Sequence, residues 1–136
     1  MTICDFIGWT FNTYPATHKG LMFSMHSAFW YLEPQPNLIV PVTDLSLYLE
    51  HHGLVFDWIA FDGCYMATYE VAYELRDLTQ YIVACETASP YIGFCTASIA
   101  TACSTARVYG HGPLSICMII ADTFIDRNEN APSEWR

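Results

Sequence analysis

Cys64 is the residue of this 136-residue chain best placed for covalent chemistry. It follows the apolar run FDWIAF at 56–61, with Asp62 and Gly63 between, and the apolar spacing after it predicts a helix over 66–78. A cysteine directly before a helix is favoured as the nucleophilic thiolate, and its backbone N–H can face a developing oxyanion. The alternative is that Cys64 packs as a small buried hydrophobe.

His26 is the candidate partner that would transfer a proton. The run GLMFSMH at 20–26 reads as a buried strand that ends at this histidine. In parallel sheets the carboxyl ends of neighbouring strands meet at one edge, so His26 and Cys64 share a crevice if their strands are neighbours. The alternative for His26 is a hydrogen-bonded core histidine.

The elements that must position these side chains alternate between strands and helices. Apolar strands without alternation, separated by helices, predict an α/β fold with a mostly parallel sheet flanked by helices on both faces. We treat residues 1–136 as a single domain. The predicted elements are strands 20–26, 56–61 and 81–85, a loop over 30–42 because of three prolines, a helix capped by Thr43 and ended by Gly53, helix 66–78, an irregular segment 89–105, helix 113–124 and a frayed tail 126–136.

Composition narrows the class of partner. Hydrophobic residues make up 53% of the chain and charged residues 14%, which suits a domain with a core. The net charge is −9, and five basic residues make no basic patch, so nucleic acid is not expected as a partner. The acidic field suits a cationic peptide, although the charge taken alone is better explained as an aid to solubility.

The six cysteines form no C-x-x-C pair, and no Cys/His cluster has zinc-finger spacing. We therefore expect no structural metal, and a metal site built from Cys64, His26 and spare thiols is the weakest of the alternatives. The first residues lack the pattern of a signal peptide, which leaves localisation unknown. The uncharged stretch 87–106 is too rich in Ser, Thr, Pro and Gly for a membrane span.

Two segments resemble the clostripain family of cysteine peptidases. The segment FDWIAFDGCYMATYEVAYELRDLTQYIVA (56–84) is similar to the family's strand, D-A-C-x-M and V-E-V-A-Y-E-L pattern. The segment YPATHKGLMFSMHSAFW (14–30) is similar to its P-A-x-x-Y-G-L-I-L-W-S-H-G-x-G-W pattern. The resemblance implies a caspase-like α/β fold and an endopeptidase that cleaves after arginine or lysine.

The resemblance also implies roles for individual residues. Cys64 takes the position of the nucleophile, His26 that of the catalytic histidine, and Asp62 that of the acid at the base of the S1 pocket. The backbone N–H groups of Ser27 and Cys64 are the expected oxyanion donors. A carboxylate in a partly desolvated pocket pairs with guanidinium or ammonium and rejects neutral side chains. The alternative for Asp62 is a turn or cap residue.

Several positions depart from the family pattern. Ser27 and Phe29 stand where the family has glycines, Ser24 where it has an aromatic residue, and Cys85 where it has a serine. No Lys or Arg lies between His26 and Cys64, which argues against self-cleavage after a basic residue in that segment.

Clostripain family members are also longer than this chain. We therefore expect a truncated member with an incomplete sheet, which a missing chain or subunit would complete. Calcium is a cofactor in parts of the family, and no EF-hand-like loop places a site for it here. A non-catalytic relic or peptide-binding module of the same fold is the alternative to an active peptidase.

Overall fold

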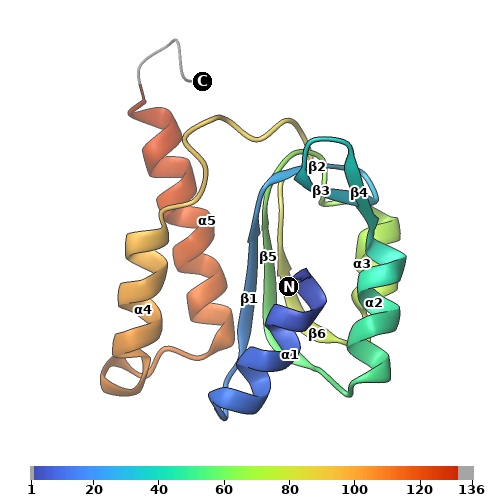
Figure 1. Cartoon of the computed structure of the whole chain (residues 1–136). Coiled ribbons are helices and arrows are strands. Elements are labelled where there is room, and N and C mark those ends of the chain that lie inside the picture. The colour runs from blue at the N-terminus through green and yellow to red at the C-terminus, as the bar shows by residue number, and fades with distance from the viewer. Residues whose placement is uncertain (1, 132–136) are drawn as a thin grey trace.

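The computed structural model describes residues 2–131, which form an α/β domain with two small sheets (Figure 1). One sheet is parallel, with strand order β1-β5-β6, and the other is antiparallel, with order β2-β3-β4. The elements are α1 (Ile3–Thr13), β1 (Gly20–Ser24), β2 (His26–Ala28), β3 (Tyr31–Gln35), β4 (Leu38–Pro41), α2 (Val42–His51), β5 (Phe56–Asp62), α3 (Tyr69–Leu75), β6 (Thr79–Val83), α4 (Thr96–Tyr109) and α5 (Pro113–Glu129).

Two apolar clusters pack on opposite faces of the parallel sheet. Ile59 and Phe61 of β5 contribute to the cluster that includes α1, α2 and α3, while Trp58 and Ala60 contribute to the cluster beneath α4 and α5. Successive side chains of a strand point to opposite faces, so one central strand supplies both clusters. This arrangement confirms the α/β fold with helices on both faces, and Figure 1 shows α4 and α5 on the side opposite α2 and α3.

The loop prediction for residues 30–42 was wrong, because this segment forms the β3–β4 hairpin. The short strand β2, which precedes the segment, pairs with β3 and completes the antiparallel sheet. Pro34 is tolerated where the pairing register shifts between Leu32 and Gln35. Asn37 makes the turn with a φ of 66°, a backbone conformation that asparagine tolerates, and its N–H donates to the Glu33 side chain at 2.9 Å.

Element boundaries also differ from the sequence predictions. The helix expected to be capped by Thr43 begins at Val42, with Pro41 as the cap residue, although Gly53 does follow its end with a φ of 62°. The third strand ends at Val83 rather than Cys85. The helix predicted over 66–78 is the shorter α3, which matters for the site described below.

Two helices were missed. The segment predicted to be irregular contains α4, which Gly110 ends in the left-handed conformation. The first residues form α1, where Thr2 and Asp5 make a capping box. The last helix begins at Pro113 as predicted, but it continues beyond Phe124 to Glu129. The prediction of a frayed tail over 126–136 was therefore wrong for residues 126–129, and residues 132–136 lie outside the described residues.

Candidate active site

The two candidate catalytic residues follow neighbouring strands. Strands β1 and β5 run parallel and pair with Ser24 opposite Asp62. His26 and Cys64 each come two residues after that last pair, so both leave the sheet at the same edge. The neighbouring strands on which the sequence prediction depended are therefore present, and the hairpin that starts with His26 lies above this edge in Figure 1.

Cys64 lies in a turn, and the prediction that it directly precedes a helix was wrong. The first helical residue is Tyr69, and the Thr68 side chain caps α3 by accepting from the Val71 N–H. The backbone between Cys64 and Tyr69 is not bonded within a helix. The Ala67 N–H, for example, donates to the Cys85 carbonyl at 3.0 Å. The dipole of α3 is therefore not the group that could favour a thiolate at Cys64.

Ser89 supplies a donor to the Cys64 sulfur instead. Its backbone N–H lies 3.3 Å from Cys64 Sγ, within hydrogen-bonding distance for sulfur. Ser89 belongs to the loop that follows β6, and the Tyr65 N–H donates to Thr87 in the same loop at 2.9 Å. The sulfur therefore receives its hydrogen bond from a loop outside both the turn and α3. The sequence prediction missed Ser89, whose position depends on this loop crossing the site.

His26 is exposed at the start of β2 and pairs with Glu33 across the antiparallel ladder. Residues directly opposite in such a ladder place their side chains on the same face. A surface hollow beside this pair is lined by Ser24, Met25, His26, Glu33, Pro34, Gln35 and Pro36. The imidazole is thus accessible, which a proton-transfer group needs and a buried core histidine would lack.

Asp62 ends β5 with a partly buried carboxylate. The Ser24 hydroxyl donates to Asp62 Oδ2 at 3.1 Å, so the serine that departs from the family pattern binds the candidate S1 acid. On its other side the carboxylate lies against Gly93, where an added β-carbon would come within 2.6 Å of Oδ2. Gly93 also has a φ of 58°, which favours glycine. The sequence prediction did not identify Gly93 as part of the site.

Ser27 contributes its side chain as well as its backbone. The side chain is 7% exposed, and its hydroxyl donates to the Cys64 carbonyl at 3.3 Å. Two residues on, the Phe29 N–H donates to the Tyr65 carbonyl at 3.0 Å, and the two rings stack with centroids 5.0 Å apart. The hairpin that carries His26 is therefore bonded directly to the turn that carries Cys64.

Two of the other thiols are less suited to nucleophilic chemistry, because burial raises the pKa of Cys85 and raises that of Cys117 to about 11. Cys95 differs, since a hydrogen bond from the Ser98 side chain lowers its pKa, but it lies at the start of α4 and not at the strand ends that precede His26 and Cys64. Within residues 2–131 no group of three or more His, Cys, Asp or Glu side chains could hold a metal ion, so no residue there is assigned to calcium. In the same described range, no helix is both long and apolar enough to cross a membrane.

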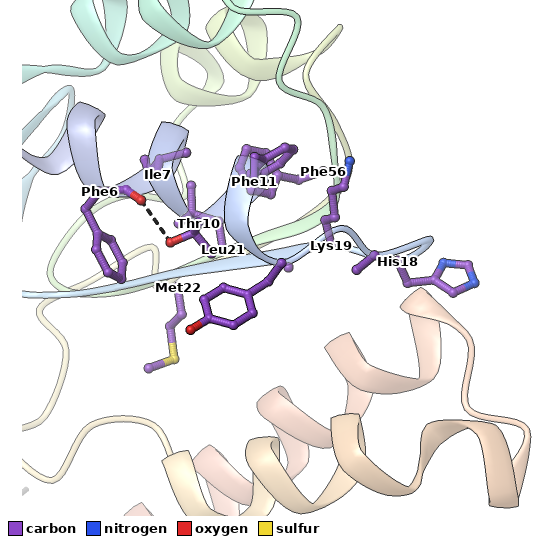
Figure 2. A pocket seen from close by; sticks show the side chains of 12 residues that line it. Phe6, Ile7, Thr10, Phe11, His18, Lys19, Leu21, Met22 and Phe56 are labelled. Carbon is purple, nitrogen blue, oxygen red and sulfur yellow. Dashed lines mark hydrogen bonds between the residues drawn. The ribbon is translucent and has the colours of Figure 1, made fainter.

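A second hollow, of about 370 Å³, lies between α1 and the side of β1 that faces away from β5, and it includes none of these site residues (Figure 2). Its walls are mainly apolar, with Phe6, Ile7 and Phe11 from the helix and Leu21 and Met22 from the strand. Because neither candidate catalytic residue lines this hollow, we do not assign it to the reaction centre.

The family model described as the Clostripain family matches residues 1–135. No match was found among curated proteins. Among solved structures, a secreted C11 cysteine protease from Bacteroides thetaiotaomicron in complex with an irreversible peptide inhibitor is 25% identical, with a TM-score of 0.74. An inactive zymogen C11 protease from Parabacteroides distasonis is 26% identical, with a TM-score of 0.72.

These matches cover nearly all of this chain and a minor part of the relatives. The chain is covered to 96% and 93%, whereas the two relatives are covered to 38% and 36%. The chain thus spans well under half the length of the proteases it matches. The match over residues 1–135, together with a parallel sheet that carries His26 and Cys64 to one edge, shows that the chain belongs to the clostripain family of cysteine proteases.

Proposed function

We propose that this chain supplies the catalytic core of a cysteine endopeptidase in which Cys64 is the nucleophile and His26 its proton-transfer partner. The pairing of Ser24 with Asp62 on adjacent parallel strands carries the proposal, because it brings the two following segments to one edge of the sheet. The exposed imidazole and the N–H from Ser89 to the Cys64 sulfur support it.

In the proposed reaction His26 takes the proton of the Cys64 thiol, and the sulfur attacks the scissile carbonyl carbon. The C–N bond then breaks as His26 gives that proton to the leaving amine. Water then hydrolyses the thioester to release the acid and regenerate the thiol. The backbone N–H groups of Ser27 and Cys64 are the proposed donors to the oxyanion, since a backbone donor does not depend on the glycine that Ser27 replaces. This chemistry needs no cofactor.

Asp62 is the proposed acid that selects lysine or arginine at P1, the residue before the scissile bond. Its carboxylate is partly buried beneath the loop that contains Gly93, where a guanidinium would meet less competition from water than at the surface. The net charge of −9 adds a field that attracts cationic peptides.

A fluorogenic peptide ending in arginine tests the nucleophile. Hydrolysis by the wild type should vanish with Cys64→Ala and with His26→Ala, and Cys85→Ala is the control that removes a neighbouring thiol. Equal hydrolysis by Cys64→Ala, or none by the wild type, would end the proposal. Parallel assays with EDTA and with added calcium show whether the ion has any role.

A matched pair of substrates tests Asp62. Citrulline has the shape of arginine without its charge, so the wild type should prefer the arginine peptide by about 10- to 100-fold in kcat/KM, as expected for a desolvated charge pair. Asp62→Asn should abolish most of that preference. A preference that survives the substitution would place the selecting acid elsewhere.

The alternative is a non-catalytic peptide-binding module. The observation that favours it is Phe29, which has a φ of 55° and a large side chain beside the candidate nucleophile turn where the family has glycine. An arginine chloromethyl ketone separates the two functions. Stoichiometric labelling at Cys64 supports the peptidase, whereas a folded protein that binds arginine peptides but is never labelled supports the module.

We also propose that the parallel sheet is completed by a strand from a further segment or subunit. Within the described residues β1 pairs only with β5, and the apolar hollow between α1 and β1 adjoins that free edge (Figure 2). An unpaired strand edge beside apolar surface is where a further strand would bind. Hydrogen exchange at Met22 tests this. Backbone groups of successive strand residues point to opposite sides, and the Lys19 carbonyl accepts from Asp57 of β5, so the Met22 N–H faces away from β5. This amide should be slower to exchange in the completed assembly than in this chain alone.

A further inference from the structure

The peptide unit between Cys64 and Tyr65 is bonded on both of its sides. Its carbonyl accepts from the Ser27 hydroxyl at 3.3 Å, and its N–H donates to the Thr87 carbonyl at 2.9 Å. The first bond comes from the β2 hairpin and the second from the loop that follows β6. This peptide therefore has little freedom to rotate, and it directly follows the α-carbon that bears the candidate nucleophile.

Ser27 also fills the space in which residue 63 would have a side chain. A β-carbon built on Gly63 would lie 2.1 Å from Ser27 Oγ, 3.2 Å from Ser27 Cβ and 2.8 Å from the Met25 carbonyl oxygen. Contacts below 3.0 Å essentially never occur, so some atoms would have to move. Ser27 is only 7% exposed, so its side chain has little room to move aside.

Space, rather than backbone conformation, requires glycine at position 63. Gly63 is absent from the glycines with positive φ, which are Gly53, Gly93 and Gly110 in the described chain. An alanine at position 63 would therefore fit the backbone and fail through its contacts. The family pattern has glycine at position 27 and alanine at position 63. This chain has a side chain at position 27 and none at position 63, which is the opposite arrangement.

We propose that Ser27 and Gly63 act as one coupled unit that positions the nucleophile. The Ser27 hydroxyl fixes the peptide that follows Cys64, and the missing side chain at position 63 makes room for that hydroxyl. The Ser27 side chain is thus proposed to position the nucleophile, a role separate from the one proposed for the Ser27 backbone N–H as an oxyanion donor. The catalytic consequence rests on the proposed function, whereas the coupling between the two positions does not.

A double-mutant cycle tests the coupling through stability. Gly63→Ala should lower the urea midpoint of unfolding, and adding Ser27→Gly should recover at least half of that loss because the clash with Oγ is removed. Recovery stays incomplete, since the contact with the Met25 carbonyl remains. Gly112→Ala is the control for an added methyl group, because a β-carbon there meets nothing within 4 Å. A double variant no more stable than Gly63→Ala would overturn the coupling.

Thiol reactivity tests the positioning separately from fold stability. The rate of alkylation of Cys64 by iodoacetamide is measured by mass spectrometry as a ratio to exposed Cys103 in the same molecule. Ser27→Ala keeps the β-carbon and removes one hydrogen bond, so this ratio should change by about threefold to tenfold. Gly63→Ala should change it by at least as much, with recovery in the double variant. An unchanged ratio in both single variants would overturn the positioning role.

Peptide hydrolysis completes the test. If the proposed function holds, Ser27→Ala should lower kcat with little change in KM, and the double variant should exceed Gly63→Ala in kcat. If the wild type hydrolyses no peptide, the proposed function fails, while the urea midpoints and the alkylation ratios still decide whether Ser27 and Gly63 are coupled.

Discussion

The carboxylate of Asp62 rests on the α-carbon of Gly93, so closely that a β-carbon on Gly93 would lie 2.6 Å from Oδ2. We predict that Gly93→Ala raises KM for an arginine peptide by about tenfold, because the added methyl group displaces the proposed S1 acid. Gly110→Ala is the matched control, since it has a similar positive φ of 70° but nothing within 4 Å. Both variants should lose stability through backbone strain, of about 1–3 kcal/mol. Only Gly93→Ala should change KM, and equal KM values in the two variants would contradict the prediction.

Ser89 should influence the reactivity of Cys64 through its backbone alone. Ser89→Pro removes the N–H that lies 3.3 Å from Cys64 Sγ, whereas Ser89→Ala keeps it. Loss of a hydrogen bond to a charged acceptor costs about 1.5–3 kcal/mol, so the proline variant should be alkylated at Cys64 about tenfold more slowly than the wild type. Mass spectrometry measures this rate as a ratio to exposed Cys103 in the same molecule. A loss of rate of the same size in Ser89→Ala would assign the effect to the hydroxyl instead.

At position 29 a glycine variant should be more stable than an alanine variant, the reverse of the order found at most ordered positions. Its φ of 55° disfavours any side chain, while its ring gains from stacking on Tyr65. Phe29→Ala loses the stack and keeps the strain, whereas Phe29→Gly loses the stack and relieves the strain. We therefore expect the glycine variant to be more stable than the alanine variant by about 1–2 kcal/mol in urea unfolding. An alanine variant of equal or greater stability would show that the strain at this position is small.

The thiols outside the site should react in an order set by their surroundings. The Ser98 hydroxyl donates to Cys95 Sγ at 3.0 Å and lowers the pKa of Cys95, whereas burial raises that of Cys117 to about 11. At pH 8 about one Cys117 in a thousand is thiolate, so Cys95 should be alkylated far sooner, and the Cys117 rate should still rise tenfold per pH unit up to pH 10. Site-resolved mass spectrometry gives both rates. Ser98→Ala should slow Cys95, and an unaltered rate would remove the hydroxyl as the cause.

The parallel sheet could be predicted because its strands contain short runs that are mainly apolar. The run that became β5 is buried on both faces, and such a run between helices has few other solutions. Gly63 and Cys64 come directly after this strand. The sequence therefore indicated that the candidate site lies at the carboxyl ends of the parallel strands. The sequence prediction of a shared edge for His26 and Cys64 depended only on the order and direction of strands.

Features that depend on tertiary contacts were not predictable from local pattern. The three prolines of the β3–β4 hairpin indicated a loop, yet the pairing of Leu32 with Val40 and a turn at Asn37 override that preference. Helix α4 is rich in Ser and Thr, whose hydroxyls bond back to the helix, as Thr101 does to Ala97 at 2.8 Å. Gly110 was the available signal for its end.

The turn at Cys64 was mistaken for a helix start for a related reason. The periodic residues Val71 and Leu75 do belong to a helix, but the backbone before Tyr69 bonds to the loop after β6 rather than to itself. Local spacing contains no information about that loop. For the same reason Ser89 and Gly93, which approach the site from a distant part of the chain, could not be identified beforehand.

Strand β5 takes part in both apolar clusters and also ends in Asp62. A packing defect in either half of the interior, for example a shortened side chain at Ile120 of α5 or at Leu49 of α2, would therefore reach the end of β5 that precedes the candidate site. The stability of the interior and the proposed peptidase activity would then not vary independently. A substitution that improves packing in either cluster would also act on the strand that leads to Cys64.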